Sequence, residues 1–161
     1  MATIGDAVAA GKLVAFALPE WEARQPIRPL WVTPELLRWM RTTPQLHDLR
    51  LGAGRKTMAE LLEMLFCDFR CAQRFSAGDL RRMLPSRKGI WKMHPYRLRI
   101  YGWAPGTNQF AAVTWAFEKD TKTNKRLNDQ KRDDVLEFVR VNRLRETVTY
   151  GDVNAVFPRD P

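Results

Sequence analysis

The chain has 161 residues, of which 45% are hydrophobic and 28% are charged, with 27 Lys and Arg against 18 Asp and Glu. This much apolar material is enough for a packed core and excludes a wholly disordered chain. No apolar run reaches the ~18 residues of a membrane span, and two cysteines are too few for a disulfide scaffold. We therefore expect a soluble, cytoplasmic protein with a single domain over residues 1–161, without a signal peptide and without membrane contact.

The positive charge is concentrated in one third of the chain. Residues 81–132 contain 13 Lys and Arg but three acids, whereas the rest of the chain contains 14 basic and 15 acidic residues. Such a concentration is expected where a protein binds a polyanion, because neutralised phosphates release their counterions. A basic surface that only maintains solubility is the alternative.

The first part of the chain is predicted to contain a strand and a helix. Residues 12–18 are hydrophobic and end at Pro19, which predicts a strand followed by an extended, proline-containing connector. The sequence Thr33-Pro34-Glu35 is typical of a helix start, because it supplies an N-cap, a first-turn proline and an acid. Pro44 is expected to end this helix.

A second, longer helix with two cysteines is predicted over residues 56–75. Apolar residues recur there at spacings of three and four, and the Ser-Ala-Gly sequence at 76–78 ends the pattern. Cys67 and Cys71 are four residues apart and therefore share one helix face, as the ligands of a metal site could. No third or fourth ligand is nearby, so we expect free cysteines beside the core, no metal and no cofactor.

The apolar period changes to two after residue 88, which predicts strands. Residues 90–94 and 96–103 alternate, and residues 110–117 are almost continuously apolar, as in a central strand. A last helix is predicted to begin at Asp129, and residues 147–157 are either one more short strand or a docked tail.

This order of elements predicts an α+β fold, in which an antiparallel meander packs on two or three helices. We expect the helices to cover one face of the sheet and to leave the other face free for a ligand. Within the domain, residues 12–75 form the strand and helical part, residues 88–146 form the meander with its helix, and residues 147–161 form a tail.

Side-chain alternation predicts which residues line the open face. Leu98 and Ile100 point toward the helices, so their neighbours on the same strand point away from them. The predicted open face therefore carries basic and aromatic residues from two neighbouring strands: Lys92, His94, Arg97, Arg99, Tyr101 and Trp103. Basic groups hold phosphates and aromatic rings stack on unpaired bases, so this face is suited to single-stranded RNA.

The segment from Lys88 to Phe138 resembles the RelE/HigB superfamily of toxins, including phage-derived HigB-like proteins. Residues 88–103 read Lys-Gly-Ile-Trp-Lys-Met-His-Pro-Tyr-Arg-Leu-Arg-Ile-Tyr-Gly-Trp, and an apolar strand ends in Phe117-Glu118-Lys119-Asp120-Thr121. These strands match the family's Gly-x-Trp, Arg-x-x-Tyr-like and Phe-x-Lys-Lys-Thr patterns over about a third of the chain. Asp120 departs from the family by replacing its second lysine.

The resemblance implies a RelE-like fold with N- and C-terminal extensions and a metal-independent mRNA endonuclease, acting on free or ribosome-bound mRNA and neutralised by an antitoxin. The chemistry would be attack of a 2′-hydroxyl on the adjacent phosphate. The implied catalytic residues are Arg97, Arg99, Lys119 and His94, with His94 as the proton shuttle. The implied RNA-binding residues are Lys92, Tyr101, Trp103, Lys122, Arg87 and Lys88.

Two non-enzymatic functions remain as alternatives. In the first, the same basic sheet binds nucleic acid without cleaving it. In the second, a protein of RelE-like fold, for example a phage-encoded one, binds and inhibits a host protein, with Trp91, Trp103 and Trp115 in the interface.

Overall fold

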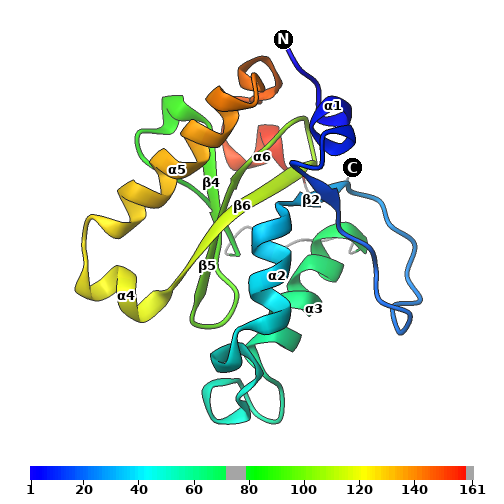
Figure 1. The fold of residues 1–161 in the computed structure, drawn as a ribbon, viewed down its shortest axis with the longest axis vertical. Helices are drawn as coiled ribbons and strands as arrows, with labels where there is room; N and C mark the ends of the chain where they lie inside the picture. The colour runs from blue at the N-terminus through cyan, green and yellow to red at the C-terminus, as the bar shows by residue number, and fades with distance from the viewer. Residues whose placement is uncertain (72–78, 159–161) are drawn as a thin grey trace.

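The computed structural model describes residues 1–71 and 79–158, which form a six-stranded mixed sheet flanked by helices (Figure 1). The strand order is β1-β2-β6-β5-β4-β3, so the longest strands lie in the middle. The strands are β1 (Val14–Ala15), β2 (Leu30–Val32), β3 (Leu80–Arg82), β4 (Ile90–Met93), β5 (Leu98–Trp103) and β6 (Phe110–Phe117). The α-helices of the described residues are α1 (Ile4–Ala9), α2 (Pro34–Thr42), α3 (Met58–Cys71), α4 (Glu118–Thr123), α5 (Leu127–Val141) and α6 (Val153–Val156).

The predicted α+β class is confirmed, and the three predicted strands after residue 88 are present. β4 pairs with β5 and β5 with β6, both in antiparallel direction. The sheet as a whole is mixed, because β2 runs parallel to β6. The predicted strand over residues 12–18 is reduced to β1, which pairs antiparallel with β2 at the sheet edge.

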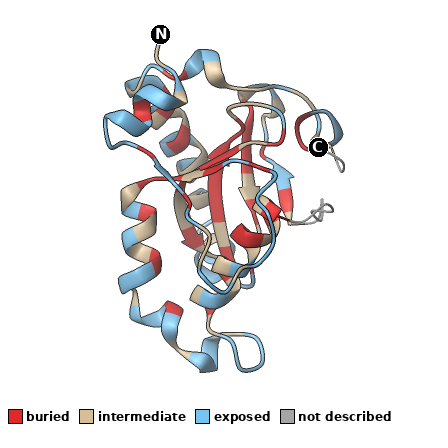
Figure 2. Ribbon diagram, turned by 90° about the vertical axis from the view of Figure 1, so that its right-hand side faces the viewer, coloured by how far each residue is buried: buried red, intermediate tan, exposed pale blue. Residues whose placement is uncertain are grey.

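Helices cover both faces of the sheet, which corrects the prediction of one open face. On one face, α2, α3 and α6 contribute to a core that includes Leu36, Phe66 and Val156. On the other face, α5 and α1 contribute to a second core that includes Val135 and Ala7. The strands between the two layers are therefore largely buried (Figure 2).

The apolar composition of β6 explains the second helical layer. Phe110 and Ala112 enter one core, whereas Ala111 and Val113 enter the other. A strand that is apolar on both faces is stable only where both faces are covered. This feature of residues 110–117 already argued against an open face.

The helix boundaries follow local capping signals. The Thr33 side chain accepts a hydrogen bond from the Leu36 amide (3.2 Å), and Pro34 occupies the first helical turn of α2, as predicted. α5 begins at Leu127, two residues before the predicted start. The predicted end of the long helix at 72–75, and its stop signal at 76–78, lie outside the described residues.

The C-terminal segment is a docked tail rather than a strand. Residues 145–147 form the 3₁₀ helix η4 (Arg145–Thr147), and α6 follows after Asp152, whose side chain accepts from the Ala155 amide. The Phe157 ring meets the Trp91 ring edge-on, with centroids 5.1 Å apart. The tail therefore closes the core beside α3 and β4.

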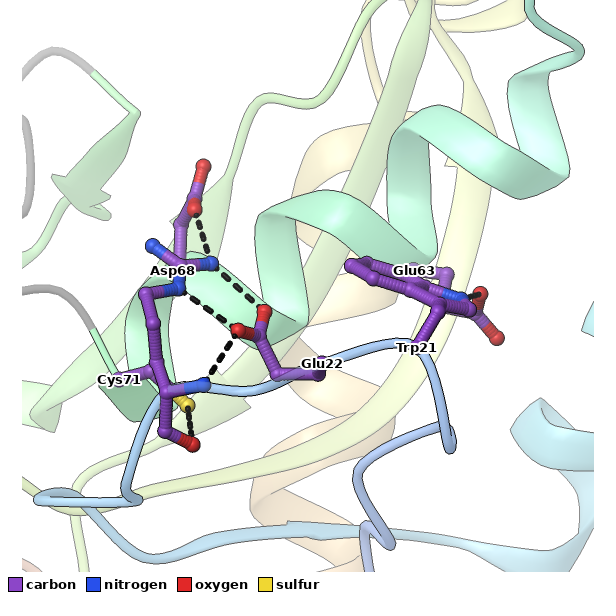
Figure 3. A network of polar contacts seen from close by, with 6 residues as sticks. Trp21, Glu22, Glu63, Asp68 and Cys71 are labelled. Carbon is purple, nitrogen blue, oxygen red and sulfur yellow. Dashed lines mark hydrogen bonds and ion pairs between the residues drawn. The ribbon is translucent and has the colours of Figure 1, made fainter.

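The connector between β1 and β2 is fixed to the outer side of α3 by polar contacts (Figure 3). Arg24 forms ion pairs with Glu22 (2.8 Å) and with Asp68 of α3 (2.9 Å). The Trp21 indole N–H donates to Glu63 of α3 at 3.2 Å. These contacts give the predicted extended connector a defined position.

Candidate nucleic-acid interface

Basic side chains from β3, β4 and β5 lie close together beside the part of the sheet that α5 covers. Arg81 of β3 pairs with Lys92 of β4, and Lys92 pairs with Tyr101 of β5. His94 follows β4 directly, one residue beyond the Met93–Ile100 pair, and thus lies beside Arg99 of β5. We call Arg81, Lys92, His94, Arg99 and the neighbouring Glu118 the sheet-end cluster.

The cluster carries more positive than negative charge. Arg99 forms an ion pair with Glu118 (3.3 Å), and Lys122 of α4 contacts the other oxygen of the same carboxylate. The hydrogen bond from Lys122 is the main reason why the pKa of Glu118 is lowered, with the charge of Arg99 as a further cause. Lys92 has no ion pair within the described residues.

The pKa values of two members are lowered first by burial and then by the neighbouring positive charges. Burial, followed by the charges of Arg99 and Arg81, lowers the pKa of Lys92. Burial, followed by Arg99, Lys92 and Arg81, lowers the pKa of His94 to about 3. The imidazole is therefore neutral at pH 7, and its buried Nε2 atom has no hydrogen-bond partner in the part of the chain that the structure describes.

Tyr101 and Trp103 do not lie on an open surface, contrary to the prediction. Both side chains are completely buried in the core beneath α5. The Tyr101 hydroxyl donates to Oδ1 of Asn128 (2.6 Å), and the Trp103 indole N–H donates to the Thr147 hydroxyl (3.1 Å). Neither ring is available to stack on a base, and burial equally removes Trp91 from a protein interface.

Arg97 and Lys119 lie apart from Arg99 on the side of α3. Arg97 occupies the turn before β5 with a φ of 51°, so its side chain leaves the alternation of the strand. Both residues line a groove of about 520 Å³ together with Gln45, Leu51 and Met58. The Lys119 ammonium lies 5.7 Å from the centroid of the Phe117 ring. The four implied catalytic residues are thus divided between two surfaces that meet at Glu118.

Arg87 and Lys88 lie at the opposite end of β4. They belong to the 3₁₀ helix η3 (Ser86–Lys88), which precedes the strand, whereas His94 follows it. Lys122 lies next to the sheet-end cluster through its contact with Glu118. The six implied RNA-binding residues therefore include two buried rings, one member of the cluster (Lys92), one residue beside it (Lys122) and two residues at the far end of β4.

Sequence reasoning missed Arg81, which belongs to the cluster through β3. That strand has three residues, and two of them are arginines, so its apolar pattern is too short to predict a strand. One sign of this strand in the sequence is that Leu80 and the two arginines stand shortly before the predicted strands of residues 90–94 and 96–103.

The two cysteines are buried, as expected, and neither forms a disulfide bond in the described chain. Burial raises the pKa of Cys67 to about 12 and also raises that of Cys71. Within the described residues, no group of three or more His, Cys, Asp or Glu side chains is arranged to hold a metal ion.

Comparison of the chain with protein-family models, with curated proteins and with solved structures finds no match. No helix among the described residues is both long enough and apolar enough to cross a membrane.

Proposed function

We propose that the protein binds RNA and that the sheet-end cluster contacts the phosphate backbone. The observation that carries this proposal is the convergence of Arg81, Lys92 and Arg99 on one surface with Glu118 as their neighbouring acid. Lys92 is half-buried and has no carboxylate partner in the described chain, so burial makes its charged form unfavourable in the free protein. A bound phosphate would offset this cost.

RNA cleavage is the further step of the proposal, consistent with the resemblance to RelE/HigB toxins. The 2′-oxygen would attack the adjacent phosphorus, and the bond to the 5′-oxygen would break, leaving a 2′,3′-cyclic phosphate and a 5′-hydroxyl. His94 is the candidate base for the 2′-hydroxyl proton, but its pKa of about 3 makes the imidazole a weak base at pH 7. Lys92, whose pKa is lowered, is the candidate donor of a proton to the leaving oxygen. Arg99 would stabilise the charge of the phosphorane.

Binding without cleavage is the second candidate function, and a specific observation favours it. The His94 ring is half-buried and its Nε2 atom is inaccessible, which restricts its approach to a 2′-hydroxyl. Lys119, the other implied phosphate clamp, contacts the Phe117 ring on a different surface. Control by an antitoxin, action on the ribosome and inhibition of a host protein remain proposals that rest on the resemblance.

The binding proposal is tested by measuring the affinity of a single-stranded RNA at several salt concentrations. Lys92→Ala and Arg99→Ala should each weaken binding about tenfold and reduce the salt slope by about one. Lys12→Ala removes one exposed positive charge outside the basic segment and serves as the matched control. Equal effects of Lys92→Ala and Lys12→Ala would contradict a localised phosphate site.

The cleavage step needs a separate experiment, because binding alone does not require it. Inducible expression with mapping of cellular RNA 5′ ends should reveal new ends with 5′-hydroxyl groups, and His94→Gln should suppress them without a matching loss of RNA affinity. Purified protein that binds RNA but produces no new ends, with or without ribosomes, would leave binding as the function.

A further inference from the structure

An exposed aromatic ring lies in a basic groove at the end of the sheet opposite the sheet-end cluster. The groove has a volume of about 540 Å³ and lies between η3, the C-terminal part of α5 and the segment that follows η4. Tyr150 is 60% exposed in it. We call this the Tyr150 groove; its lining includes Arg87, Lys88, Glu137, Arg145 and Tyr150.

The Tyr150 ring is held in position although it is exposed. The Thr149 amide donates to the Ala104 carbonyl (2.9 Å), and Arg82 donates to the Gly151 carbonyl (2.9 Å). Gly89 has a φ of 68°, and a Cβ atom added there would lie 3.1 Å from the Tyr150 ring. The ring therefore packs on the backbone of Gly89, and a ligand can stack on it without first ordering a flexible loop.

Basic residues outnumber acidic residues around the ring. The two acids of the groove already have partners, because Glu137 pairs with Arg140 (2.6 Å) and Asp133 pairs with Arg132 (2.9 Å). Arg87, Lys88 and Arg145 form no ion pair with the residues that the structure describes, although the charge of Arg145 is a minor cause, after Arg140, of the lowered pKa of Glu137. The groove thus combines one accessible aromatic face with three unpaired cations.

We propose that the Tyr150 groove binds one base and the adjoining phosphates of a single-stranded RNA. The base would stack on Tyr150, and Arg87, Lys88 and Arg145 would contact the phosphates. This inference rests on the proposed RNA binding and deepens it, because Tyr101 and Trp103 are buried and cannot supply the stacking surface. A protein partner fits less well, because Arg87, Lys88 and Arg145 surround the ring and charged residues are depleted at the core of protein interfaces.

The experiment compares a 12-nucleotide single-stranded RNA with an abasic oligomer that has the same number of phosphates. Tyr150→Ala should weaken binding of the RNA about tenfold, as expected for the loss of one stacked base, and leave binding of the abasic oligomer unchanged. Tyr150→Phe keeps the ring and should bind both oligomers like the wild type. Arg145→Ala should weaken binding of both oligomers and reduce the salt slope by about one.

The results of this experiment distinguish failure of the Tyr150 groove from failure of the proposed RNA binding. Wild-type affinity of Tyr150→Ala for the RNA, with weakened binding by Lys92→Ala, would overturn the groove while leaving the proposed function in place. Equal losses of Tyr150→Ala on both oligomers would show a structural effect of the ring and also overturn stacking. Failure of the wild-type protein to bind either oligomer would overturn the proposed function and this inference together.

Discussion

Lys92 on β4 and Tyr101 on β5 are direct cross-strand partners, yet Tyr101 is completely buried while Lys92 is only half-buried. The difference arises because α5 packs over Tyr101, whose hydroxyl donates a 2.6 Å hydrogen bond to Oδ1 of Asn128 near the start of that helix. The boundary between core and candidate RNA surface therefore runs between these two residues.

Tyr101→Phe tests this boundary. The substitution removes the hydrogen bond to Asn128 and leaves the ring in the core, so the free energy of unfolding should fall by about 1 kcal/mol. RNA affinity should not change, because the buried hydroxyl cannot reach a ligand. Urea unfolding and RNA titration of the same preparation give both values. A loss of RNA affinity without a loss of stability would contradict the burial of Tyr101.

Leu98→Ala and Arg97→Ala compare two adjacent residues with opposite environments. Leu98 is completely buried in the core beneath α2 and α3, so its truncation should lower the free energy of unfolding by about 2–5 kcal/mol. Arg97 is exposed in the turn before β5, and its truncation should change stability by about 0.5 kcal/mol or less. Chemical denaturation of both variants checks the contrast, which similar losses would refute.

The much lowered pKa of His94 predicts a dependence of stability on pH. The folded protein has a pKa of about 3 at this residue, against an ordinary value of 6.5, so the unfolded chain binds the proton more readily. The contribution of His94 to stability is fully present above pH 6.5 and is lost as the pH falls from 6.5 toward 3. His94→Gln should make the decline in unfolding free energy between pH 7 and 5 less steep. Parallel curves for wild type and variant would show that His94 is not desolvated.

The sequence predicted the interior strands well because their signals are local. The alternation of residues 90–103 and the apolar run of 110–117 identify β4, β5 and β6, and Thr33-Pro34 identifies the start of α2. β2 and β3 have three residues each, which is too short for a periodic pattern. They form strands because each pairs with a longer strand, β2 with β6 and β3 with β4. The three residues themselves do not show that such a partner is present.

The candidate site was harder to predict because alternation gives the face of a residue but not what covers that face. Lys92, His94 and Arg99 were assigned to one side, and the structure brings them together there. Tyr101 and Trp103 point to the same side but lie under α5, which packs on them through residues such as Val135 and Val139. Tyr150 was predicted only as part of a strand or tail, and its exposure depends on the path of the irregular segment between η4 and α6.

Glu22→Gln and Asp68→Asn test the attachment of the connector to α3. The Glu22 carboxylate is only 4% exposed, and hydrogen bonds from Arg24 lower its pKa to about 2 from the ordinary 4.5. Asp68 contacts the same guanidinium but is 51% exposed. We expect Glu22→Gln to lower the thermal midpoint at pH 7 more than Asp68→Asn does. The ion pair of Glu22 stabilises the fold above pH 4.5 and is lost as the pH falls toward 2, so the effect of Glu22→Gln should shrink at low pH.

Gly102→Ala tests the irregular pairing between β5 and β6. Gly102 pairs with Ala112 while Tyr101 pairs with Thr114, so Val113 is an extra residue on β6. A Cβ atom at Gly102 would lie 2.0 Å from the Ala111 carbonyl oxygen, which belongs to the backbone and cannot move aside by a rotamer change. The variant should therefore lose roughly 1–3 kcal/mol of stability or more, the usual cost of overpacking. Gly54→Ala is the matched control at a loop position where an added Cβ meets nothing within 4 Å, although its φ of 63° also disfavours alanine. Gly102→Ala should unfold at a clearly lower urea concentration than Gly54→Ala, and the reverse order would rule out the close approach of β5 and β6 at this position.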